Sequence, residues 1–342
     1  MGKSSIIHQR ARSPARAVVQ CAIFGCLLAA SVTGQESLLL KAATKGAETL
    51  LQNDRGKWPL YSLKSGDTWQ LDLPNGKEFD ASGLLLLTNG TLLTLSDRGP
   101  TLYSIRIRPG TNTAGLVALT NCFTPAQLKP YAREKFGYYD SEGIAGDVQG
   151  RLYICEEANR WILRCDPATR RVERLDIDWS PVKKYFSADR NASFEGIAVG
   201  GDKLYVANER NSPVVIVVDL KSLQVVDHFQ VFPQTPSFLG THYSDLSWHG
   251  GKLWVLCRQH RVIVEVDPQT RQIVSEYDYN SIEEQLGYQT RYPVGVMEGL
   301  AVTDDVFWLV TDNNGMPRKS APDDIRPTLV RVARPRPETP KE

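Results

Sequence analysis

The sequence predicts an all-β protein, a β-propeller built from four-stranded blades, and two observations carry this prediction. One is an internal repeat. Five segments share a pattern and recur at intervals of about 50 to 60 residues, namely 81–99, 141–159, 194–211, 244–260 and 297–314. The other is the composition between these segments, where β-branched and aromatic residues form runs of strand length. Four antiparallel strands per repeat of this length are typical of propeller blades.

Within a repeat the strands follow a fixed order, which the third repeat illustrates. The first strand, FEGIAV (194–199), leads to Gly200-Gly201, a pair that tolerates the positive φ of a hairpin turn. The second strand is KLYVA (203–207), the third PVVIVVD (213–219) and the fourth QVVDHFQV (224–231). Longer connections lead to the next first strand, and they cover 121–140, 178–193, 232–243 and 280–296.

The last repeat is incomplete, which raises the question of how the ring closes. It has a third strand, TLVRVA (328–333), and no fourth strand after it. The segment TWQLDL (68–73) has the length of a strand, and we expect it to complete the last blade and close the ring. Closure removes an open edge that would invite aggregation. We expect five blades; the alternative is that 58–73 belongs to an incomplete sixth blade.

The two ends of the chain are predicted to lie outside the propeller. Residues 1–35 have the order of a secretory signal peptide: a basic head, an apolar run and small residues. The apolar run is shorter than the about 20 residues of a membrane span. We therefore expect cleavage and an exported protein, periplasmic or extracellular, rather than an N-terminal anchor or a lipoprotein. We assign 36–57 to an N-terminal arm, 58–334 to the propeller and 335–342 to a loose tail.

Charge and motifs exclude several classes of function. Forty basic and thirty-nine acidic residues give a net charge of +1, without the basic surplus of most nucleic-acid-binding proteins. The chain lacks the glycine-rich loops of nucleotide-binding proteins and the motifs GxSxG and HExxH, so no nucleotide or organic cofactor is indicated. No later segment is apolar enough to span a membrane, and we expect a monomer.

The repeat brings acidic residues to one face of the predicted ring. The start of the first strand and the end of the second lie at the same face because these strands are antiparallel. At the start of the first strands the sequence has Glu142, Glu195, Asp245 and Glu298, with Ser82 in the first repeat. At the end of the second strands it has Asp97, Glu157, Glu209 and Asp312, with Arg258 in the fourth repeat. We therefore predict an acidic face around the mouth of the central channel.

Carboxylates this close together resist ionising unless a cation compensates them. Hard oxygen ligands favour Ca²⁺ or Mg²⁺, so all of these acids are candidate calcium ligands, and Glu142, Glu195 and Glu298 are the candidate catalytic residues. The cationic side chains of this face are candidates for binding an anionic group, and they are Arg98, Arg210, Arg258 and His260. The alternative is architectural: the acids accept hydrogen bonds from backbone N–H groups of neighbouring blades, and the arginines form salt bridges.

Two cysteines are expected on neighbouring strands of the second repeat, Cys155 on its second strand and Cys165 on its third. They lie about equally far from the intervening turn, so they would face each other across the hairpin. An exported protein permits a disulfide between them. The alternative is two small buried residues, because the equivalent positions elsewhere hold residues such as Ala207 and Val218.

Four of the repeats resemble a known family. The segments SEGIAGDVQGRLYICEE, NASFEGIAVGGDKLYVANER, SDLSWHGGKLWVLCRQHRVIVEVD and MEGLAVTDDVFWLVTD resemble, in that order, the bacterial propellers called "esterase-like activity of phytase". They resemble the SdiA-regulated propeller family about as well. The resemblance covers about residues 80–332 and implies an exported, calcium-binding propeller that hydrolyses phosphoesters or esters. It carries over Glu142, Glu157, Glu195, Glu209, Asp245 and Glu298. Ser82, Arg258 and the lack of a dense Lys and Arg lining depart from the pattern and argue against phytase activity proper.

Two functions follow from these observations. The first is an exported, metal-dependent hydrolase of phosphate or carboxylate esters, whose partner is a small-molecule or anionic ester ligand. The second is a non-catalytic propeller that binds a small ligand or a protein at the same face. Aromatic residues of the long connections would form its apolar rim, and they are Trp179, Tyr185, Phe186, Phe238, Tyr243 and Tyr292.

Overall fold

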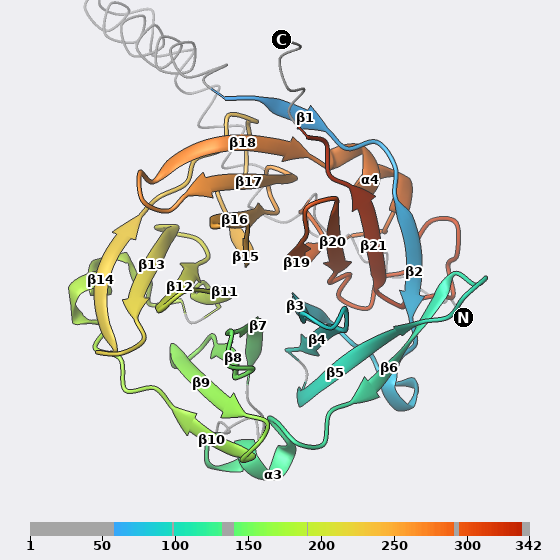
Figure 1. Cartoon of the computed structure of the whole chain (residues 1–342). Helices are drawn as coiled ribbons and strands as arrows, with labels where there is room; N and C mark the ends of the chain where they lie inside the picture. Colours follow the sequence, from blue (N-terminus) through green and yellow to red (C-terminus); the bar gives the residue numbers. More distant parts are fainter. Residues whose placement is uncertain (1–57, 98, 132–139, 190, 291–293, 337–342) are drawn as a thin grey trace, which may run out of the picture. The chain divides into compact units, whose positions relative to one another are not determined.

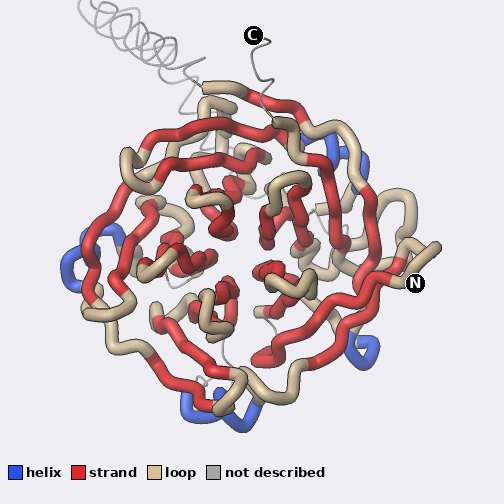
Figure 2. Tube along the Cα trace, viewed as in Figure 1, coloured by secondary structure: helices blue, strands red, loops and turns tan. Residues whose placement is uncertain are grey.

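The computed structural model describes residues 58–97, 99–131, 140–189, 191–290 and 294–336. The predicted signal peptide (1–35), the predicted arm (36–57) and most of the predicted tail lie outside these residues. The described chain is all-β and propeller-like, with its strands grouped around a centre (Figure 1). Short helices lie at the periphery (Figure 2). Within these ranges no helix is long and apolar enough to cross a membrane.

Consecutive strands pair in antiparallel order, as the repeat predicts. The first repeat forms β3 (Ala81–Leu86), β4 (Leu92–Ser96), β5 (Gly99–Ile107) and β6 (Thr113–Ala118). The second forms β7 (Ser141–Gly146), β8 (Leu152–Glu156), β9 (Trp161–Asp166) and β10 (Arg171–Arg174). The third forms β11 (Phe194–Gly200), β12 (Lys203–Asn208), β13 (Val214–Asp219) and β14 (Gln224–Phe229).

The last two repeats continue this arrangement. The fourth forms β15 (Tyr243–His249), β16 (Lys252–Cys257), β17 (Val262–Asp267) and β18 (Gln272–Asp278). The fifth forms β19 (Met297–Val302), β20 (Val306–Thr311) and β21 (Thr328–Ala333). The connections carry the short helices α3 (Pro125–Leu128) and α4 (Asn280–Leu286) and the 3₁₀ helices Pro74–Gly76, Lys129–Tyr131 and Ser180–Tyr185.

Two N-terminal strands run along the outside of the sheets. Strand β2 (Asp67–Leu71) pairs antiparallel with β21, as expected for the strand that completes the last repeat, and it also pairs parallel with β6. The strands of the first and last repeats therefore form one eight-stranded sheet. Strand β1 (Leu60–Ser62) pairs parallel with β18. The repeat pattern does not predict β1, because this strand is added to a repeat that already has four strands.

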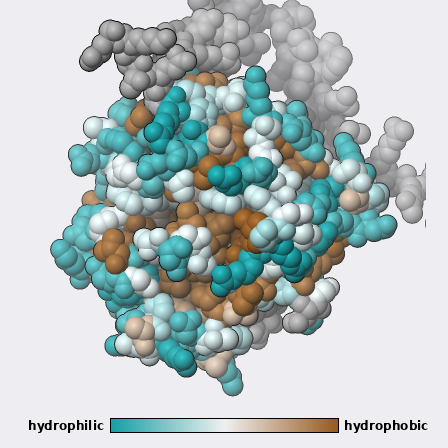
Figure 3. All heavy atoms as spheres, turned by 45° about the vertical axis from the view of Figure 1, so that its right-hand side comes forward, coloured by the Kyte–Doolittle hydropathy of each residue, from teal (hydrophilic) through white to brown (hydrophobic). Residues whose placement is uncertain are grey.

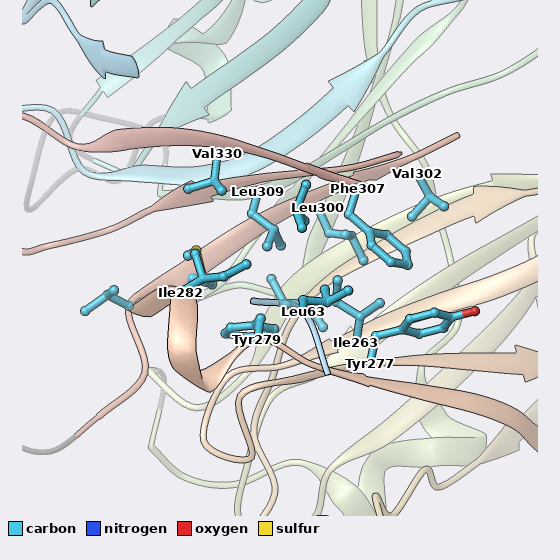
Figure 4. Packing of buried hydrophobic residues seen from close by; sticks show 14 of the residues in the cluster. Leu63, Ile263, Tyr277, Tyr279, Ile282, Leu300, Val302, Phe307, Leu309 and Val330 are labelled. Atoms are coloured by element: carbon cyan, nitrogen blue, oxygen red, sulfur yellow. The ribbon is translucent and has the colours of Figure 1, made fainter. Parts of the chain in front are cut away.

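The hydrophobic cores lie between neighbouring sheets, because alternate residues of a strand point to opposite faces. Where the fourth and fifth repeats meet, Ile263 and Tyr277 pack against Leu300 and Phe307, with Ile282 of α4 at the same core (Figure 4). The rings of Tyr277 and Phe307 lie 4.9 Å apart in an edge-to-face arrangement. Each such buried side chain contributes about 1.5–3 kcal/mol, so the packed sheets form a rigid frame for the loops.

A β-bulge at the start of each first strand determines which side chain reaches the channel mouth. The register of β11 on β12 passes from Phe194↔Asn208 to Gly196↔Ala207, so Glu195 is the bulged residue. The register shifts of the other first strands put Ser82, Glu142, Ser244 and Glu298 in a bulge.

The expected equivalence of Asp245 with the glutamates is therefore wrong by one residue. Asp245 pairs with Leu256 as Gly196 pairs with Ala207, so Asp245 occupies the glycine position of the repeat. Glycine is required elsewhere because the inner strands approach backbone to backbone. A Cβ atom on Gly196 would lie 2.5 Å from the Cα of Asp245. The fourth repeat has Asp245 in place of this glycine. In the sequence Asp245 precedes the apolar Leu246, so it is easily aligned with the glutamates of the other repeats.

The structure also settles the pairing of the cysteines. Cys165 forms a disulfide with Cys122, which lies in the connection before α3, and Cys155 is a buried free thiol. The ladder of β8 and β9 pairs Cys155 with Ile162 and Leu152 with Cys165, so the two cysteines of the hairpin do not face each other. A Cys155–Cys165 disulfide is therefore excluded, and the reading of Cys155 as a small buried residue holds.

Candidate functional site

Carboxylates from several strand ends meet at one face of the inner strands. Oxygens of Asp140, Glu142 and Glu157 lie within 4.8 Å of one another, and so do oxygens of Glu157, Glu195 and Glu209. The bulges at the start of β7 and β11 direct Glu142 and Glu195 here, and the ends of β8 and β12 supply Glu157 and Glu209. We call Asp140, Glu142, Glu157 and Glu195 the acidic cluster.

Burial and mutual repulsion dominate the electrostatics of the acidic cluster. Burial and the neighbouring carboxylate of Glu195 raise the pKa of Glu142 well above its usual value. Burial, Glu209 and Glu157 raise the pKa of Glu195 in the same way. Burial and Asp140 raise the pKa of Glu157 to about 8, although the N–H of Ser193 and Arg210 act in the opposite direction. Burial and mutual repulsion therefore favour the protonated form of these carboxyl groups, and a cation among them would favour the ionised form.

Glu195 shows this lack of compensation most clearly. Its side chain is only 8% exposed. Within the described ranges its carboxylate neither accepts a hydrogen bond nor forms an ion pair, and its pKa is moved by burial and by charges alone. A buried carboxylate without a partner costs several kcal/mol when ionised, on the order of 3–5 kcal/mol. Glu195 is therefore the residue that an added cation would stabilise most directly.

A second set of charged residues at the same face is compensated within the protein. Glu209 is fully buried, and its carboxylate forms ion pairs with Arg210 and Arg258. The other side of the Arg258 guanidinium contacts Glu298. Burial favours protonation of Glu209, but His242, Arg258 and Arg210 outweigh it and hold the pKa of Glu209 below its usual value. We call Arg210, Glu209, Arg258 and Glu298 the ion-pair ladder.

The predicted anion-binding side chains are largely engaged with the protein itself. Arg210 also contacts the backbone oxygen of Asn191, and one guanidinium nitrogen lies 3.6 Å from Asp189. His260 has both ring nitrogens in contacts, Nδ1 at 2.6 Å from the backbone oxygen of Thr235 and Nε2 at 2.9 Å from Thr241 Oγ1. Burial lowers the pKa of His260. Arg98 lies outside the described residues.

The remaining predicted residues lie around this face in different roles. Asp245 is fully buried, and its carboxylate accepts the backbone N–H groups of Leu300 at 2.7 Å, Leu246 at 2.8 Å and Leu84 at 3.4 Å. These residues belong to the fifth, fourth and first repeats, so Asp245 is an architectural joint at the centre. This arrangement matches the architectural alternative and separates Asp245 from the acidic cluster.

Three other residues of the predicted ring have individual roles at this face, and they are Ser82, Asp97 and Asp312. Ser82 donates its hydroxyl hydrogen to the backbone oxygen of Ser141 at 2.9 Å and links the first repeat to the second. Asp312 accepts the N–H of Asn314 at 2.7 Å. The charge of Asp97 contributes, after burial and Glu195, to the raised pKa of Glu142. Asp97 thus borders the acidic cluster, whereas Asp312 closes a turn.

Sequence reasoning missed Asp140, and it considered His242 only as a base beside Ser82 and not as a neighbour of Glu209. Asp140 lies two positions before the bulged Glu142 and belongs to a connection, so it falls outside the repeat pattern. His242 lies 3.3 Å from Glu209 through Nδ1, and its connection enters β15. The signal that would have revealed Asp140 is the run Asp140-Ser141-Glu142, in which one serine separates two acids at the start of a strand.

The channel beyond the carboxylates is apolar. The inner strands line it with residues such as Leu84, Ile144, Ile197, Leu246 and Val302, around a cavity of about 60 Å³. Hydrophobic residues also gather in the hollow of the face shown in Figure 3, with hydrophilic residues around it. A cavity of this size holds little more than water.

Comparisons with known proteins agree with this architecture. Residues 80–315 match the family model called phytase-like, with the description "esterase-like activity of phytase". Among solved structures, the chain is similar to the glutaminyl cyclase of Myxococcus xanthus, with 15% identity, a TM-score of 0.52, and coverage of 81% of this chain and 99% of that one. This likeness supports the propeller-like fold.

Two further structures are more distant. The PQQ-bound aldose sugar dehydrogenase of Streptomyces coelicolor has 12% identity and a TM-score of 0.42 and covers 79% of this chain and 99% of that one. The calcium-binding protein regucalcin of Agrobacterium tumefaciens has 12% identity and a TM-score of 0.42, with coverage of 80% and 96%. A search of curated proteins finds no match.

Proposed function

Because this chain belongs to the phytase-like family described as "esterase-like activity of phytase", we propose that it is an exported, calcium-dependent hydrolase of phosphate or carboxylate esters. The proposal includes a ring of five blades that β2 closes, and a monomer that works outside the cytoplasm. The observation that carries it is the acidic cluster, in which the buried Glu195 carboxylate neither accepts a hydrogen bond nor forms an ion pair within the described residues. The predicted signal peptide of residues 1–35 supports export.

The acidic cluster fits a hard divalent cation. Its donors are carboxylate oxygens only. They form two overlapping groups within 4.8 Å, Asp140 with Glu142 and Glu157, and Glu157 with Glu195 and Glu209. Calcium accepts six to eight oxygen ligands in a flexible arrangement, whereas magnesium demands near-ideal octahedral geometry. A cation would also offset the repulsion that raises the pKa values of Glu142, Glu157 and Glu195. Asp140, Glu142, Glu157 and Glu195 are the residues that would hold it.

The side chains of the site divide the work of such a reaction. Calcium held by Asp140, Glu142, Glu157 and Glu195 would supply Lewis-acid chemistry for an ester oxygen and for a water molecule. Glu195, without an internal partner, is the carboxylate best placed to take up a proton, and Glu142 is its nearest alternative. Glu298 is a weaker candidate because Arg258 already neutralises it. Arg210 and Arg258 keep Glu209 ionised and hold the strand ends at fixed positions.

One observation favours a second candidate function, a non-catalytic propeller that binds a small ligand or protein at this face. Arg210, Arg258 and His260 are engaged in contacts within the protein, so they are not free to orient an anionic substrate. A calcium ion at the acidic cluster would then stabilise the ring without catalysis. The two candidates differ in whether calcium binding is accompanied by turnover.

The test measures calcium and turnover in the same preparations. Calcium titration by calorimetry and thermal unfolding with EGTA or with added calcium would be compared for the wild type and Glu195→Gln. Hydrolysis of p-nitrophenyl phosphate and p-nitrophenyl acetate would be followed in parallel. Glu284→Gln, on an exposed residue of α4, is the matched control. We expect calcium to raise the Tm of the wild type and of the control, and Glu195→Gln to lose most of this rise and the turnover.

The outcomes separate the candidates. If calcium neither binds nor changes the Tm, and no ester is hydrolysed faster than by Glu195→Gln, the hydrolase proposal fails. If calcium binds and stabilises the protein but no ester is turned over, the non-catalytic candidate is favoured instead.

A further inference from the structure

The connection from β14 to β15, residues 230–242, exposes large apolar side chains. Phe238 is 82% exposed, Phe232 54% and Leu239 37%. Single exposed apolar residues are ordinary on a protein surface. Three of them within eight residues of one connection are more than scatter, and burying them against a ligand would be favourable.

This connection is held in place at both ends. The carboxylate of Glu276 accepts the backbone N–H groups of Gln234 at 2.9 Å and Thr235 at 3.0 Å. His260 contacts the backbone oxygen of Thr235 and the hydroxyl of Thr241, so it joins the two ends. Gly240 has a φ of +82°, a conformation that favours glycine and turns the chain back toward β15. The exposure of Phe238 is therefore a consequence of a fixed loop conformation.

The loop returns to the charged site directly after its tip. His242 follows Phe238 by four positions, and its Nδ1 lies 3.3 Å from the carboxylate of Glu209. Glu209 in turn lies within 4.8 Å of Glu157 and Glu195. The loop that carries Phe238 and Leu239 is therefore joined to a neighbour of the acidic cluster through His242, and we call these two residues the apolar lip.

Three other aromatic residues predicted for the rim are packed into the protein, whereas Tyr292 lies outside the described residues. Tyr243 is fully buried. Trp179 and Phe186 pack against Phe194, with ring centroids 4.9 Å and 5.7 Å apart. Of the predicted rim aromatics within the described ranges, Phe238 is the one that remains exposed. The apolar contact surface for a ligand is thus concentrated at the lip.

Charge at the same face disfavours a phosphate substrate. The guanidinium of Arg258 is bound by Glu209 on one side and Glu298 on the other. A phosphate that used this arginine would have to displace a buried carboxylate. An uncharged ester avoids this cost.

Resting on the proposed function, we infer that the apolar lip selects carboxylic esters with an apolar acyl chain over phosphate monoesters. Water attacks the acyl carbon, the bond to the leaving oxygen breaks, and a carboxylic acid and an alcohol are released. The acyl chain lies against Phe238 and Leu239 while its carbonyl is at the acidic cluster. Phe238 is a specificity-determining residue in this arrangement and takes no part in the proton transfers.

The experiment measures kcat/KM of the full protein in calcium for p-nitrophenyl acetate, butyrate and octanoate and for p-nitrophenyl phosphate. Wild type should prefer octanoate over acetate and hydrolyse the phosphate most slowly. Phe238→Ala should lower kcat/KM for octanoate about tenfold and for acetate less than about twofold, because only the long chain reaches the lip. Phe238→Leu should retain most of the octanoate rate. Val148→Ala, at a 90% exposed residue of the turn between β7 and β8, should change nothing.

Two results would overturn the inference. Equal losses for all three esters in Phe238→Ala, or faster hydrolysis of the phosphate than of octanoate, contradict selection by the lip while leaving the dependence on Glu195 intact. If wild type hydrolyses no substrate faster than Glu195→Gln does, the proposed function itself fails and the inference with it. The two failures are therefore distinguishable.

Discussion

Two neighbouring parts of the carboxylate face, built from the same repeat positions, differ in how their charge is compensated. In the acidic cluster, the bulged Glu195 lies beside Glu157, which follows the second strand of the preceding repeat. In the ion-pair ladder, the bulged Glu298 meets Arg258 at that same repeat position. One change of residue type thus turns a repulsive pair into an ion pair. The ladder pairs its carboxylates with arginines, whereas the Glu195 carboxylate of the cluster forms no ion pair within the described residues.

The largest expected effect comes from removing the arginine that makes this difference. Arg258→Met leaves Glu209 and Glu298 buried with less compensation, and we expect it to lower the free energy of unfolding by about 4 kcal/mol. Urea unfolding monitored by tryptophan fluorescence measures this change. Because the variant converts the ladder into a second acidic cluster, calcium should stabilise it more than the wild type.

The control for this variant replaces an exposed arginine that also forms an ion pair with a glutamate. Arg171 pairs with Glu173 at 3.2 Å, and its side chain is 76% exposed. Arg171→Met should change the free energy of unfolding by less than about 0.5 kcal/mol. A loss as small as this in Arg258→Met would mean that the ladder does not hold the strand ends together.

A somewhat smaller loss is expected at Asp245, the acid that serves neither the ladder nor the cluster. Asp245→Ala leaves the N–H groups of Leu84, Leu246 and Leu300 buried without their acceptor. We expect a loss of about 3 kcal/mol in the free energy of unfolding, since each unsatisfied group costs about 1–3 kcal/mol and local relaxation recovers part of this.

Calcium titration of the same variant sharpens the distinction between joint and cluster. Asp245→Ala should bind calcium like the wild type, and Asp323→Ala, at an exposed residue, should match the wild type in both measurements. Loss of calcium binding in Asp245→Ala without loss of stability would place Asp245 among the ligands instead.

Replacing a glutamate by glutamine should change the free energy of unfolding in opposite directions in the acidic cluster and in the ion-pair ladder. In calcium-free buffer Glu195→Gln should raise the free energy of unfolding by about 1–2 kcal/mol, because it removes a carboxyl group whose ionisation is opposed by burial and by the neighbouring acids. Glu298→Gln should lower it, because Arg258 loses one of its carboxylates. Chemical unfolding of both variants in EGTA makes the comparison. Equal signs for the two changes would show that the cluster and the ladder are electrostatically alike.

The repeat explains how much of this architecture could be predicted from the sequence. Periodicity and turn residues predict the strands and the pairing of β2 with β21, because both follow from local pattern and the need to close an edge. The place of Asp245 could not be predicted, because the register depends on a bulge and on the close approach of inner strands. The Cys122–Cys165 disulfide joins a connection to a strand, which hairpin geometry does not reveal.

The sequence predicts that these acids gather at one face, but it does not predict which of them are paired with arginines. Antiparallel strands alone bring Glu142, Glu157 and Glu195 to one face. Which carboxylates are neutralised depends on how far the side chain of Arg258 reaches between neighbouring repeats, and this is a property of the packed ring. Asp140 belongs to a connection, where no periodicity constrains its position.

The smallest expected effect is the dependence of stability on pH between 6 and 7. The pKa of Glu157 is raised to about 8, mainly by burial and Asp140, against about 4.3 in an unfolded chain. Between these two values the folded protein holds a proton that the unfolded chain has released. Stability without calcium should therefore fall as pH rises through this window, by at most about 1.4 kcal/mol per pH unit for one proton.

Urea unfolding in EGTA at pH 6 and pH 7 measures this slope, and Glu157→Gln is the variant that isolates it. The glutamine cannot titrate, so the variant should lose up to about 1.4 kcal/mol per pH unit of the wild-type slope. Saturating calcium should flatten the wild-type slope as well, because a cation at the cluster favours the ionised carboxylate. Glu173→Gln, on an exposed strand of the second repeat, should keep the wild-type slope. A wild-type slope that neither calcium nor Glu157→Gln reduces would mean that the protons are held elsewhere and that the cluster is compensated like the ladder.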